Sequence, residues 1–517
     1  MRTEKKAAVK NRVAWLIVVL AMIVLEIYWL YGLLAKLNAA FTWVQTGVRI
    51  AALVVSIVIF GENRNAAVKM PWIILILLAP EFGLLMYALA GRVNVTKRMR
   101  KRYAAIDKLL HPMLVQDAAV ADRLRKEDRA LANICHYVRH YGPYPVYDNT
   151  KVRFFDMAAP ALDALKEDLR KAEHFIFMEY FAIEDAEAFE GIHRILRDKV
   201  KEGVEVRLFY DDIGSIGFIN RSFIKRMAAD GIQCRDFNPV IPFLNTFMNN
   251  RDHRKFTVID GHVAYCGGFN LANEYFNLTH PYGYWKDTGV RLEGSAARSF
   301  TLMFFEMWNA VKNSDTPDEI DAKYLNPWTP VEDAEGYVQP YADSPLDFEH
   351  VGEDVYLNLI KNAKRYFYIS TPYLIITDEM NRELGLAAKR GVDVRIITPG
   401  VPDKRFVYAV TRSYYPQLVC NGVRIFEYQP GFIHAKQCVC DGESATVGTI
   451  NLDYRSFYLH FECGVQLVKV PAIADITADF AHTFTLCHEV TETYRYSEIS
   501  LPRQLVQSVL RLFAPIL

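Results

Sequence analysis

The chain has 517 residues, which is long for one compact core, so we expect two or three structural units. Hydrophobic residues make up 51% of the chain and aromatic residues 13%, which excludes a globally disordered protein. The 60 Lys and Arg balance the 60 Asp and Glu, and this zero formal charge disfavours a dedicated nucleic-acid binder, which usually has a basic excess. The 8 cysteines lack zinc-site spacing, so we expect them to be reduced and free of metal.

The N-terminal region is strongly apolar and contains three apolar stretches, at about 13–34, 41–60 and 71–90. A helix that spans a bilayer needs ~20 mostly apolar residues, and the first and third stretches meet that requirement. The middle stretch carries Arg49, and its uninterrupted apolar part, Ile50 to Phe60, is too short to span by itself. It either crosses the membrane or lies at the interface. We therefore expect residues 1–92 to form a transmembrane anchor of two or three helices.

Basic residues flank this anchor on both sides: Arg2, Lys5, Lys6, Lys10 and Arg12 before it, and Arg92, Lys97, Arg98, Arg100, Lys101 and Arg102 after it. The positive-inside rule places both flanks in the cytoplasm. That placement requires an even number of spans, so one of the three stretches would not cross. We expect a multi-pass membrane protein whose soluble part faces the cytoplasm, with residues 93–150 as a basic juxtamembrane linker with helices.

From about Val152 onward the chain predicts an α/β protein, because strand-like apolar runs alternate with helical ones. The same features occur twice in the same order. Gly203–Arg207 matches Gly391–Arg395, for example, and an H-x-K-x4-D motif follows each of them. A polar, proline-rich stretch separates the copies. We expect a first lobe at 151–312, an inter-lobe linker at 313–348 and a second lobe at 349–517, which ends in an amphipathic helix.

Each H-x-K-x4-D motif lies in a predicted strand. Residues two apart on a strand point to the same face, so His253 and Lys255 project together, and the second copy repeats this with His434 and Lys436. The motif aspartates, Asp260 and Asp441, complete the two candidate catalytic sets. Each precedes a glycine, and for both aspartates a turn or lobe-contact role is favoured over proton transfer.

A small residue and an asparagine follow each motif at the same spacing. They are Gly268 and Asn270 in the first copy, and Thr449 and Asn451 in the second. Small residues let the backbone approach a bound group, and an asparagine amide can donate to an oxyanion. We expect these four residues to bind a substrate phosphate. The Thr449 hydroxyl either donates to that phosphate or only fills space.

A histidine, a lysine and an asparagine, each contributed twice, suit reaction at a phosphodiester. The lysines neutralise the non-bridging oxygens, one imidazole attacks phosphorus to form a phosphohistidine, and the other acts as acid and then base. No metal or other cofactor is required, because two lysines already offset the phosphate charge. Asp287 and Glu462 occupy equivalent places after the motifs and are expected to orient the histidines, with a structural salt bridge as the alternative.

The paired motifs resemble those of the phospholipase D superfamily. Several segments are also similar to bacterial cardiolipin synthases: Pro430–Lys436, Gly448–Phe457, Leu459–Glu462, Asp212–Ser215, Thr371–Tyr373, Gly267–Tyr275 and the apolar segment from Trp72 to Gly91. The resemblance implies two lobes of mixed β-sheets with flanking helices, related by a pseudo-twofold axis, with the site at their seam. Superfamily precedent makes His253 the expected nucleophile and His434 the acid and base.

The activity that this resemblance implies is phosphatidyl transfer from one phosphatidylglycerol to another, giving cardiolipin and glycerol. The implied partners are these two lipids and the lipid bilayer of a bacterial cell (inner) membrane. No nucleic-acid partner is expected, and the formation of a homo-oligomer is left open. A hydrolytic phospholipase D, or a phosphatidyltransferase that uses another alcohol, shares the motifs and remains an alternative. A phospholipase D-type nuclease fits less well, because the chain is neutral and anchored.

Overall fold

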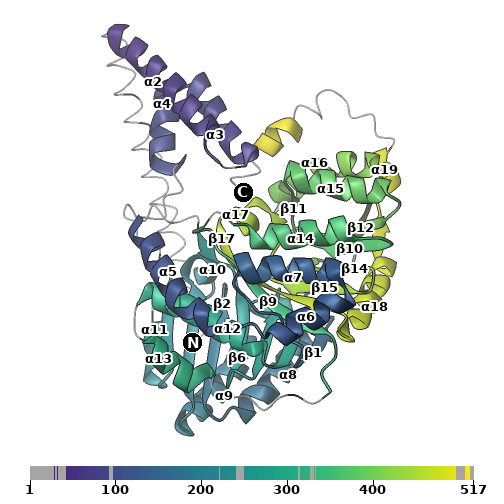
Figure 1. Cartoon of the computed structure of the whole chain (residues 1–517). Coiled ribbons are helices and arrows are strands. Elements are labelled where there is room, and N and C mark those ends of the chain that lie inside the picture. Colours follow the sequence, from purple (N-terminus) through teal and green to yellow (C-terminus); the bar gives the residue numbers. More distant parts are fainter. Residues whose placement is uncertain are drawn as a thin grey trace.

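The structure is a computed structural model, and it describes residues 28, 32, 42–63, 65–91, 97–220, 222–239, 250–312, 315–325, 331, 333–347, 349–495 and 507–512. Apart from Tyr28 and Gly32, the first apolar stretch lies outside these residues, as does the basic N-terminal head. Of the expected C-terminal helix, only 507–512 is described, and it is helical. Figure 1 shows two lobes of sheet and helix, from which the apolar helices α2, α3 and α4 project together.

The first lobe is built on a seven-stranded mixed sheet, counted over the described residues, in the order β1-β8-β7-β6-β2-β3-β4. Its strands are β1 (Thr150–Phe155), β2 (Phe175–Tyr180), β3 (Glu205–Asp211), β4 (Gln233–Phe237), β6 (Lys255–Ile259), β7 (Val263–Gly267) and β8 (Gly289–Gly294). Strands β2, β3 and β4 are parallel, whereas the others pair antiparallel. Every residue of β2 is buried, as expected of a central strand that is covered on both faces.

The second lobe repeats this strand order. Its sheet runs β9-β17-β15-β14-β10-β12-β13, with β18 added at the far edge. The strands are β9 (Tyr337–Asp343), β10 (Tyr366–Ser370), β12 (Asp393–Pro399), β13 (Arg424–Tyr428), β14 (Gln437–Cys440), β15 (Ser444–Gly448), β17 (His460–Val468) and β18 (Cys487–Glu489). Two repeated α/β lobes with mixed sheets are therefore confirmed. Because β9 belongs to this sheet, we propose that the second lobe begins at β9, inside the stretch expected to be linker.

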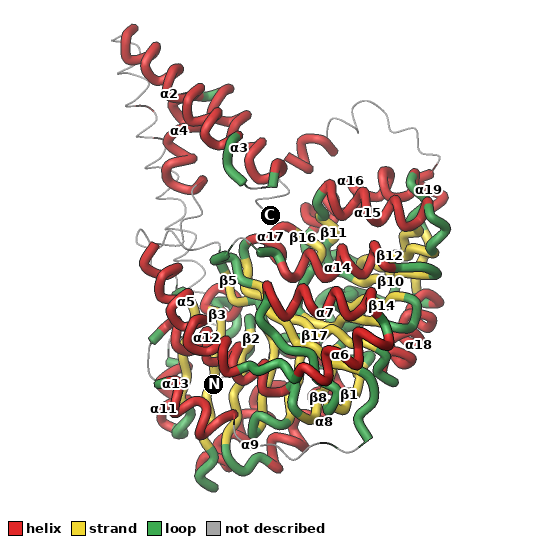
Figure 2. The backbone as a smooth tube through the Cα atoms, viewed as in Figure 1, coloured by secondary structure: helices red, strands yellow, loops and turns green. Residues whose placement is uncertain are grey.

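Helices cover both sheets, as Figure 2 shows. In the first lobe they include α8 (Ala158–Lys171), α9 (Glu187–Lys201) and α12 (Ala297–Val311); in the second, α14 (Val351–Asn362), α15 (Asp378–Lys389), α16 (Arg405–Cys420), α17 (Tyr454–Tyr458) and α18 (Ala472–Thr485). Helix α12 contacts β2 and β6 of its own lobe and β9 of the other. Almost all of its residues are buried, as expected of a largely apolar helix inside a protein core. It therefore belongs to the core that joins the two lobes.

The apolar N-terminal region forms a long helix followed by a broken one. Among the described residues, α2 (Thr42–Phe60) alone is long and apolar enough to cross a membrane, and it includes Arg49. The third stretch differs from expectation, since it divides into α3 (Ala66–Leu78) and α4 (Pro80–Met86). Pro80 lacks the N–H that a continuous helix needs, and Ala79 before it leaves the helical conformation.

The broken helix is folded tightly, and it touches the catalytic part of the chain. A Cβ atom added to Gly83 would lie 2.5 Å from Cα of Ile76, so only glycine permits this approach. At the other end of α3, the Asn65 Nδ2 donates to the Tyr458 hydroxyl at 3.5 Å. Since Tyr458 is the last residue of α17, the anchor reaches a helix of the second lobe.

Candidate active site

The two lobes exchange backbone contacts next to each motif histidine. The short strand β5 (Arg251–Asp252) leaves the first lobe and pairs with the start of β17, and the His253 N–H donates to the Phe461 carbonyl at 2.9 Å. The second motif does the same in reverse, because the His434 N–H donates to the Lys286 carbonyl at 2.7 Å. Phe461 directly precedes Glu462, and Lys286 directly precedes Asp287. Each histidine is therefore fixed next to a carboxylate of the opposite lobe.

That exchange places each imidazole on a carboxylate of the other lobe. Nδ1 of His253 lies 2.8 Å from Oε1 of Glu462, and Nδ1 of His434 lies 2.7 Å from Oδ2 of Asp287. Both carboxylates are the ones predicted to orient the histidines, but nothing in their spacing indicated that they cross between lobes. With Nδ1 occupied, Nε2 of each ring is the atom left for chemistry.

Burial controls the charge of these groups. It raises the pKa of Asp287 to about 7 and that of Glu462 well above its usual value, although nearby lysines oppose both shifts. Burial, followed by the charges of the motif lysines, lowers the pKa of His253 and of His434 well below the ordinary value. Both imidazoles are therefore neutral near pH 7, which is the form that a nucleophile or a general base needs.

The motif lysines are almost fully buried behind the histidines. Lys255 donates to the backbone carbonyl of His253, whereas Lys436 donates to the carbonyl of His434 and its Nζ also lies 2.7 Å from Nδ1 of that ring. Burial lowers the pKa of Lys255 to about 8 and that of Lys436 to about 7. A bound phosphodiester anion would supply the negative charge that restores their cationic forms.

Both motif asparagines line the same cavity as the histidines. The Asn270 Nδ2 donates to the Tyr275 hydroxyl at 2.8 Å, and its Oδ1 accepts from the Ala182 N–H at 3.0 Å. Oδ1 of Asn451 has no hydrogen-bond partner within the described part of the chain. Phosphate binding by either residue stays a prediction.

Gly268 and Thr449 occupy equivalent places beside the carboxylate of their own lobe. The Thr449 hydroxyl donates to Oε2 of Glu462 at 2.5 Å, so it holds the carboxylate that contacts His253. A Cβ atom at Gly268 would lie 2.1 Å from Oδ1 of Asp287, so this position has no room for a side chain. These contacts indicate a positioning role, and a direct contact with phosphate remains a prediction for both residues.

The motif aspartates bind backbone. Asp260 accepts from three consecutive N–H groups at the start of β2, and Asp441 from three at the start of β10, at 2.7 to 2.9 Å. Both adopt a left-handed conformation, with φ of 50° and 57°. Neither lines the cavity. The contacts favour the turn role over proton transfer.

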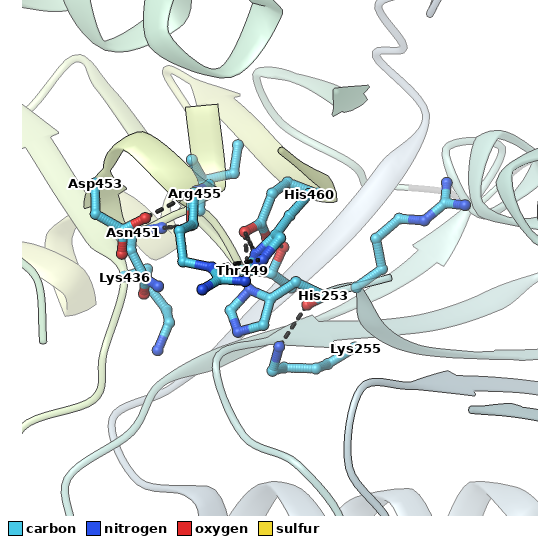
Figure 3. Close-up of polar contacts among 12 residues, drawn as sticks. His253, Lys255, Lys436, Thr449, Asn451, Asp453, Arg455 and His460 are labelled. Carbon is cyan, nitrogen blue, oxygen red and sulfur yellow. Dashed lines mark hydrogen bonds and ion pairs between the residues drawn. The ribbon is translucent and has the colours of Figure 1, made fainter. Parts of the chain in front are cut away.

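The cavity has a volume of about 330 Å³, and both motif histidines line it. The sequence motifs assigned no role to several of its polar lining residues: Arg251, Tyr373, Asp403, Lys404, Asp453, Arg455 and His460. Four of them lie within segments that carried the family resemblance, namely Tyr373, Asp453, Arg455 and His460, whereas nothing pointed to Lys404. Figure 3 shows Arg455 and His460 close to His253 and Lys255.

Two groups of side chains have the spacing of metal ligands. Ligand atoms of His253, His460 and Glu462 all lie within 4.8 Å of one another, as do those of a second group, Asp107, His111 and Glu306. In the first group, Arg455 and Lys255 are among the charges that lower the pKa of His460 after burial. This positive surrounding suits an anion better than a metal ion.

The fold and the paired histidines define a phospholipase D-type enzyme. Residues 165–288 and 356–484 match the family model described as "Cardiolipin synthase, PLD-like domain", and 50–92 match the phospholipase D-nuclease N-terminal family. The phosphatidylserine synthase of Haemophilus influenzae shares the fold, with a TM-score of 0.55 at 16% identity over 75% of this chain and 97% of its own.

Two related proteins indicate the family within this class. A cardiolipin synthase of Geobacillus kaustophilus is 33% identical over 90% of this chain and 92% of its own length. An uncharacterised protein of Streptococcus mutans is 41% identical over 86% of this chain and 96% of its own length. The chain belongs to the cardiolipin synthase family of the phospholipase D superfamily. It is therefore a phosphatidyltransferase of the phospholipase D type, associated with a membrane.

Proposed function

We propose that this chain is a cardiolipin synthase that converts two phosphatidylglycerol molecules into cardiolipin and glycerol through a phosphohistidine. The observation that carries the proposal is the crossed pairing of His253 with Glu462 and of His434 with Asp287, around one cavity. Two oriented imidazoles at the same phosphate provide a nucleophile, which reacts in its neutral form, and a separate acid and base, which is protonated beside the bound anion.

In the first half of the reaction, Nε2 of His253 attacks the phosphorus of the donor lipid. The bond from phosphorus to the glycerol headgroup breaks, and His434, which must carry a proton on Nε2 when the donor is bound, gives that proton to the departing glycerol oxygen. The negative charge of the bound phosphodiester favours this protonated form. Lys255 and Lys436 offset the charge on the non-bridging oxygens. Glu462 stabilises the positive charge that develops on the His253 ring.

In the second half, a second phosphatidylglycerol enters with its terminal hydroxyl beside His434. This histidine now takes the hydroxyl proton, and the oxygen attacks phosphorus. The bond between phosphorus and His253 Nε2 breaks, which releases cardiolipin and returns both imidazoles to their starting forms.

The two rings differ in a way that favours His253 as the nucleophile. Nζ of Lys436 lies 2.7 Å from Nδ1 of His434, whereas Nζ of Lys255 donates to the backbone carbonyl of His253. A cation beside His434 opposes the positive charge that a phosphorylated imidazole carries. His253, whose carboxylate partner is also held by Thr449, is the better site for the covalent intermediate.

The test is incubation of the purified protein with phosphatidylglycerol in mixed micelles, followed by mass spectrometry of the lipids and of free glycerol. We expect equal amounts of cardiolipin and glycerol, lost in both His253→Ala and His434→Ala. His482→Ala, on an exposed helix position, is the matched control and should retain activity. Glycerol with phosphatidic acid but no cardiolipin would instead make water the acceptor and the chain a hydrolase.

We further propose that residues 1–92 anchor the enzyme and that the lobes face the cytoplasm. The anchor is followed by the basic helix α5 (Lys97–Leu110), whose charges fit the positive-inside rule. Cys420 is exposed on the second lobe and offers a native probe. A membrane-impermeant maleimide should label Cys420 only after the bacterial inner membrane is permeabilised, with Cys420→Ser as the unlabelled control. Labelling in intact spheroplasts would place the lobes outside.

A further inference from the structure

The cavity carries more positive charge than one phosphodiester needs. It is lined by Arg251, Lys404 and Arg455, and the two motif lysines are buried beside the histidines that line it. Arg251 is already neutralised, because its Nε donates to the Asp211 carboxylate at 2.8 Å and its Nη2 donates to two backbone carbonyls. Lys404 and Arg455 are the two other cations that line the cavity.

Lys404 lies directly before α16, and its side chain is exposed. Within the described part of the chain, it makes no ion pair or hydrogen bond; its Nζ lies 5.4 Å from the centre of the Tyr373 ring. The neighbouring carboxylate of Asp403 instead accepts from the Tyr373 hydroxyl at 2.5 Å. The charge of Lys404 acts on the site, since it is one of the charges that lower the pKa of His434.

Arg455 reaches the cavity from α17. Its Nε donates to Nε2 of His460 at 3.3 Å, and Figure 3 shows its side chain running toward His460 and His253. Burial, opposed by Asp453, lowers the pKa of Arg455. The guanidinium is thus held partly desolvated beside the reacting histidine, where it gains most from an anionic partner.

We infer that Lys404 and Arg455 bind the phosphodiester of the acceptor phosphatidylglycerol, so that the cavity holds two phosphates during transfer. This inference rests on the proposed function. The acceptor oxygen and the acceptor phosphate belong to one glycerol, so the second phosphate must lie within one glycerol length of the reacting phosphorus. Two such anions repel each other in a partly buried cavity unless additional cations are present.

The same two residues explain how a lipid competes with water for the phosphohistidine. Water and free glycerol carry no phosphate, so neither gains from Lys404 or Arg455. A phosphatidylglycerol acceptor gains both contacts, and they place its terminal hydroxyl near His434. The pair therefore favours a phosphate-bearing acceptor over a neutral one.

The test compares two reactions of one phosphatidyl-enzyme in mixed micelles. One is cardiolipin formation, and the other is exchange of isotopically labelled glycerol into phosphatidylglycerol, which uses a neutral acceptor. In Lys404→Gln and in Arg455→Gln, we expect the ratio of cardiolipin formation to glycerol exchange to fall about tenfold or more, the size of one charge-assisted contact. Arg455→Lys keeps the charge and should recover part of the ratio.

The matched control is Arg405→Gln, which removes an exposed neighbouring charge that does not line the cavity. Its ratio should equal that of the unaltered protein, which separates a phosphate contact from general attraction to anionic lipid. Equal falls of both reactions in the Lys404 and Arg455 variants would overturn the inference, because the pair would then serve the donor or the chemistry. Glycerol exchange without any cardiolipin from the unaltered protein would overturn the proposed function itself.

Discussion

Nδ1 of His253 lies 2.8 Å from Oε1 of Glu462, although the two residues are 209 positions apart and belong to different lobes. The pair His434 and Asp287 repeats this relationship in the opposite direction, at 2.7 Å. Neither lobe alone therefore contains an oriented catalytic histidine. The crossing explains why the duplicated lobes are joined by a shared core instead of acting as independent units.

The crossed carboxylates should be required for turnover. Glu462→Gln and Asp287→Asn keep the shape of the side chain but remove the charge that steadies the opposite histidine. We expect each to lower kcat about 10–100-fold. Glu443→Gln, an exposed carboxylate in the β14–β15 turn, is the control and should retain full activity. Variants of Glu462 and Asp287 that stay within twofold of the unaltered enzyme would remove the orienting role.

The pH profile should report the motif lysines. Burial lowers the pKa of Lys436 to about 7 and that of Lys255 to about 8. A lysine is cationic below its pKa, so the free enzyme loses these charges as the pH rises through 7 to 8. We expect kcat/KM for phosphatidylglycerol to fall across that range, and kcat to fall at higher pH, because bound phosphate raises both pKa values. If kcat/KM stays constant up to the pH at which ordinary lysines lose their proton, the motif lysines do not have lowered pKa values.

The motif aspartate of the second lobe should matter for stability. Asp441→Ala leaves three backbone N–H groups at the start of β10 without their acceptor, and each buried unpaired group costs about 1–3 kcal/mol. We expect a clear fall in Tm with turnover per folded molecule retained, and a smaller fall for Asp441→Asn, which keeps one oxygen. An unchanged melting curve with lost turnover would instead give Asp441 a chemical role.

Thr449 offers a test between positioning and phosphate binding. Thr449→Val keeps the volume but removes the hydroxyl that donates to Glu462. If Thr449 acts through Glu462, kcat falls about tenfold with KM nearly unchanged, and Thr449→Ser restores it. A rise in KM at constant kcat would show that the hydroxyl contacts the substrate phosphate.

Much of the lobe architecture was predictable from the sequence. The matched positions of His253 and His434, with a lysine two residues later, indicated a duplicated strand motif, and the two sheets do share one strand order. The crossing of Glu462 and Asp287 was not predictable, because spacing within each copy carries no information about which lobe a side chain faces. It depends on the short backbone pairing before each histidine.

The other differences between the predictions and the structure have local causes. The stretch 71–90 was apolar enough for one long helix, but Pro80 divides it and Gly83 allows the two parts to pack together. Lys404 belongs to no repeated motif, so its place in the cavity follows from tertiary structure alone. Thr449 lies where the second motif predicts a phosphate-binding residue, yet its hydroxyl donates to the carboxylate of Glu462.

A phosphatidyl group on His253 is detected most directly by peptide mass spectrometry of the unaltered enzyme after brief mixing with phosphatidylglycerol. The reaction is stopped with denaturant at mildly alkaline pH, because the bond between phosphorus and a histidine nitrogen hydrolyses in acid. We predict an adduct on the peptide that contains His253, and none in His253→Ala. An adduct on His434 in the unaltered enzyme, with His253 unmodified throughout, would contradict this prediction.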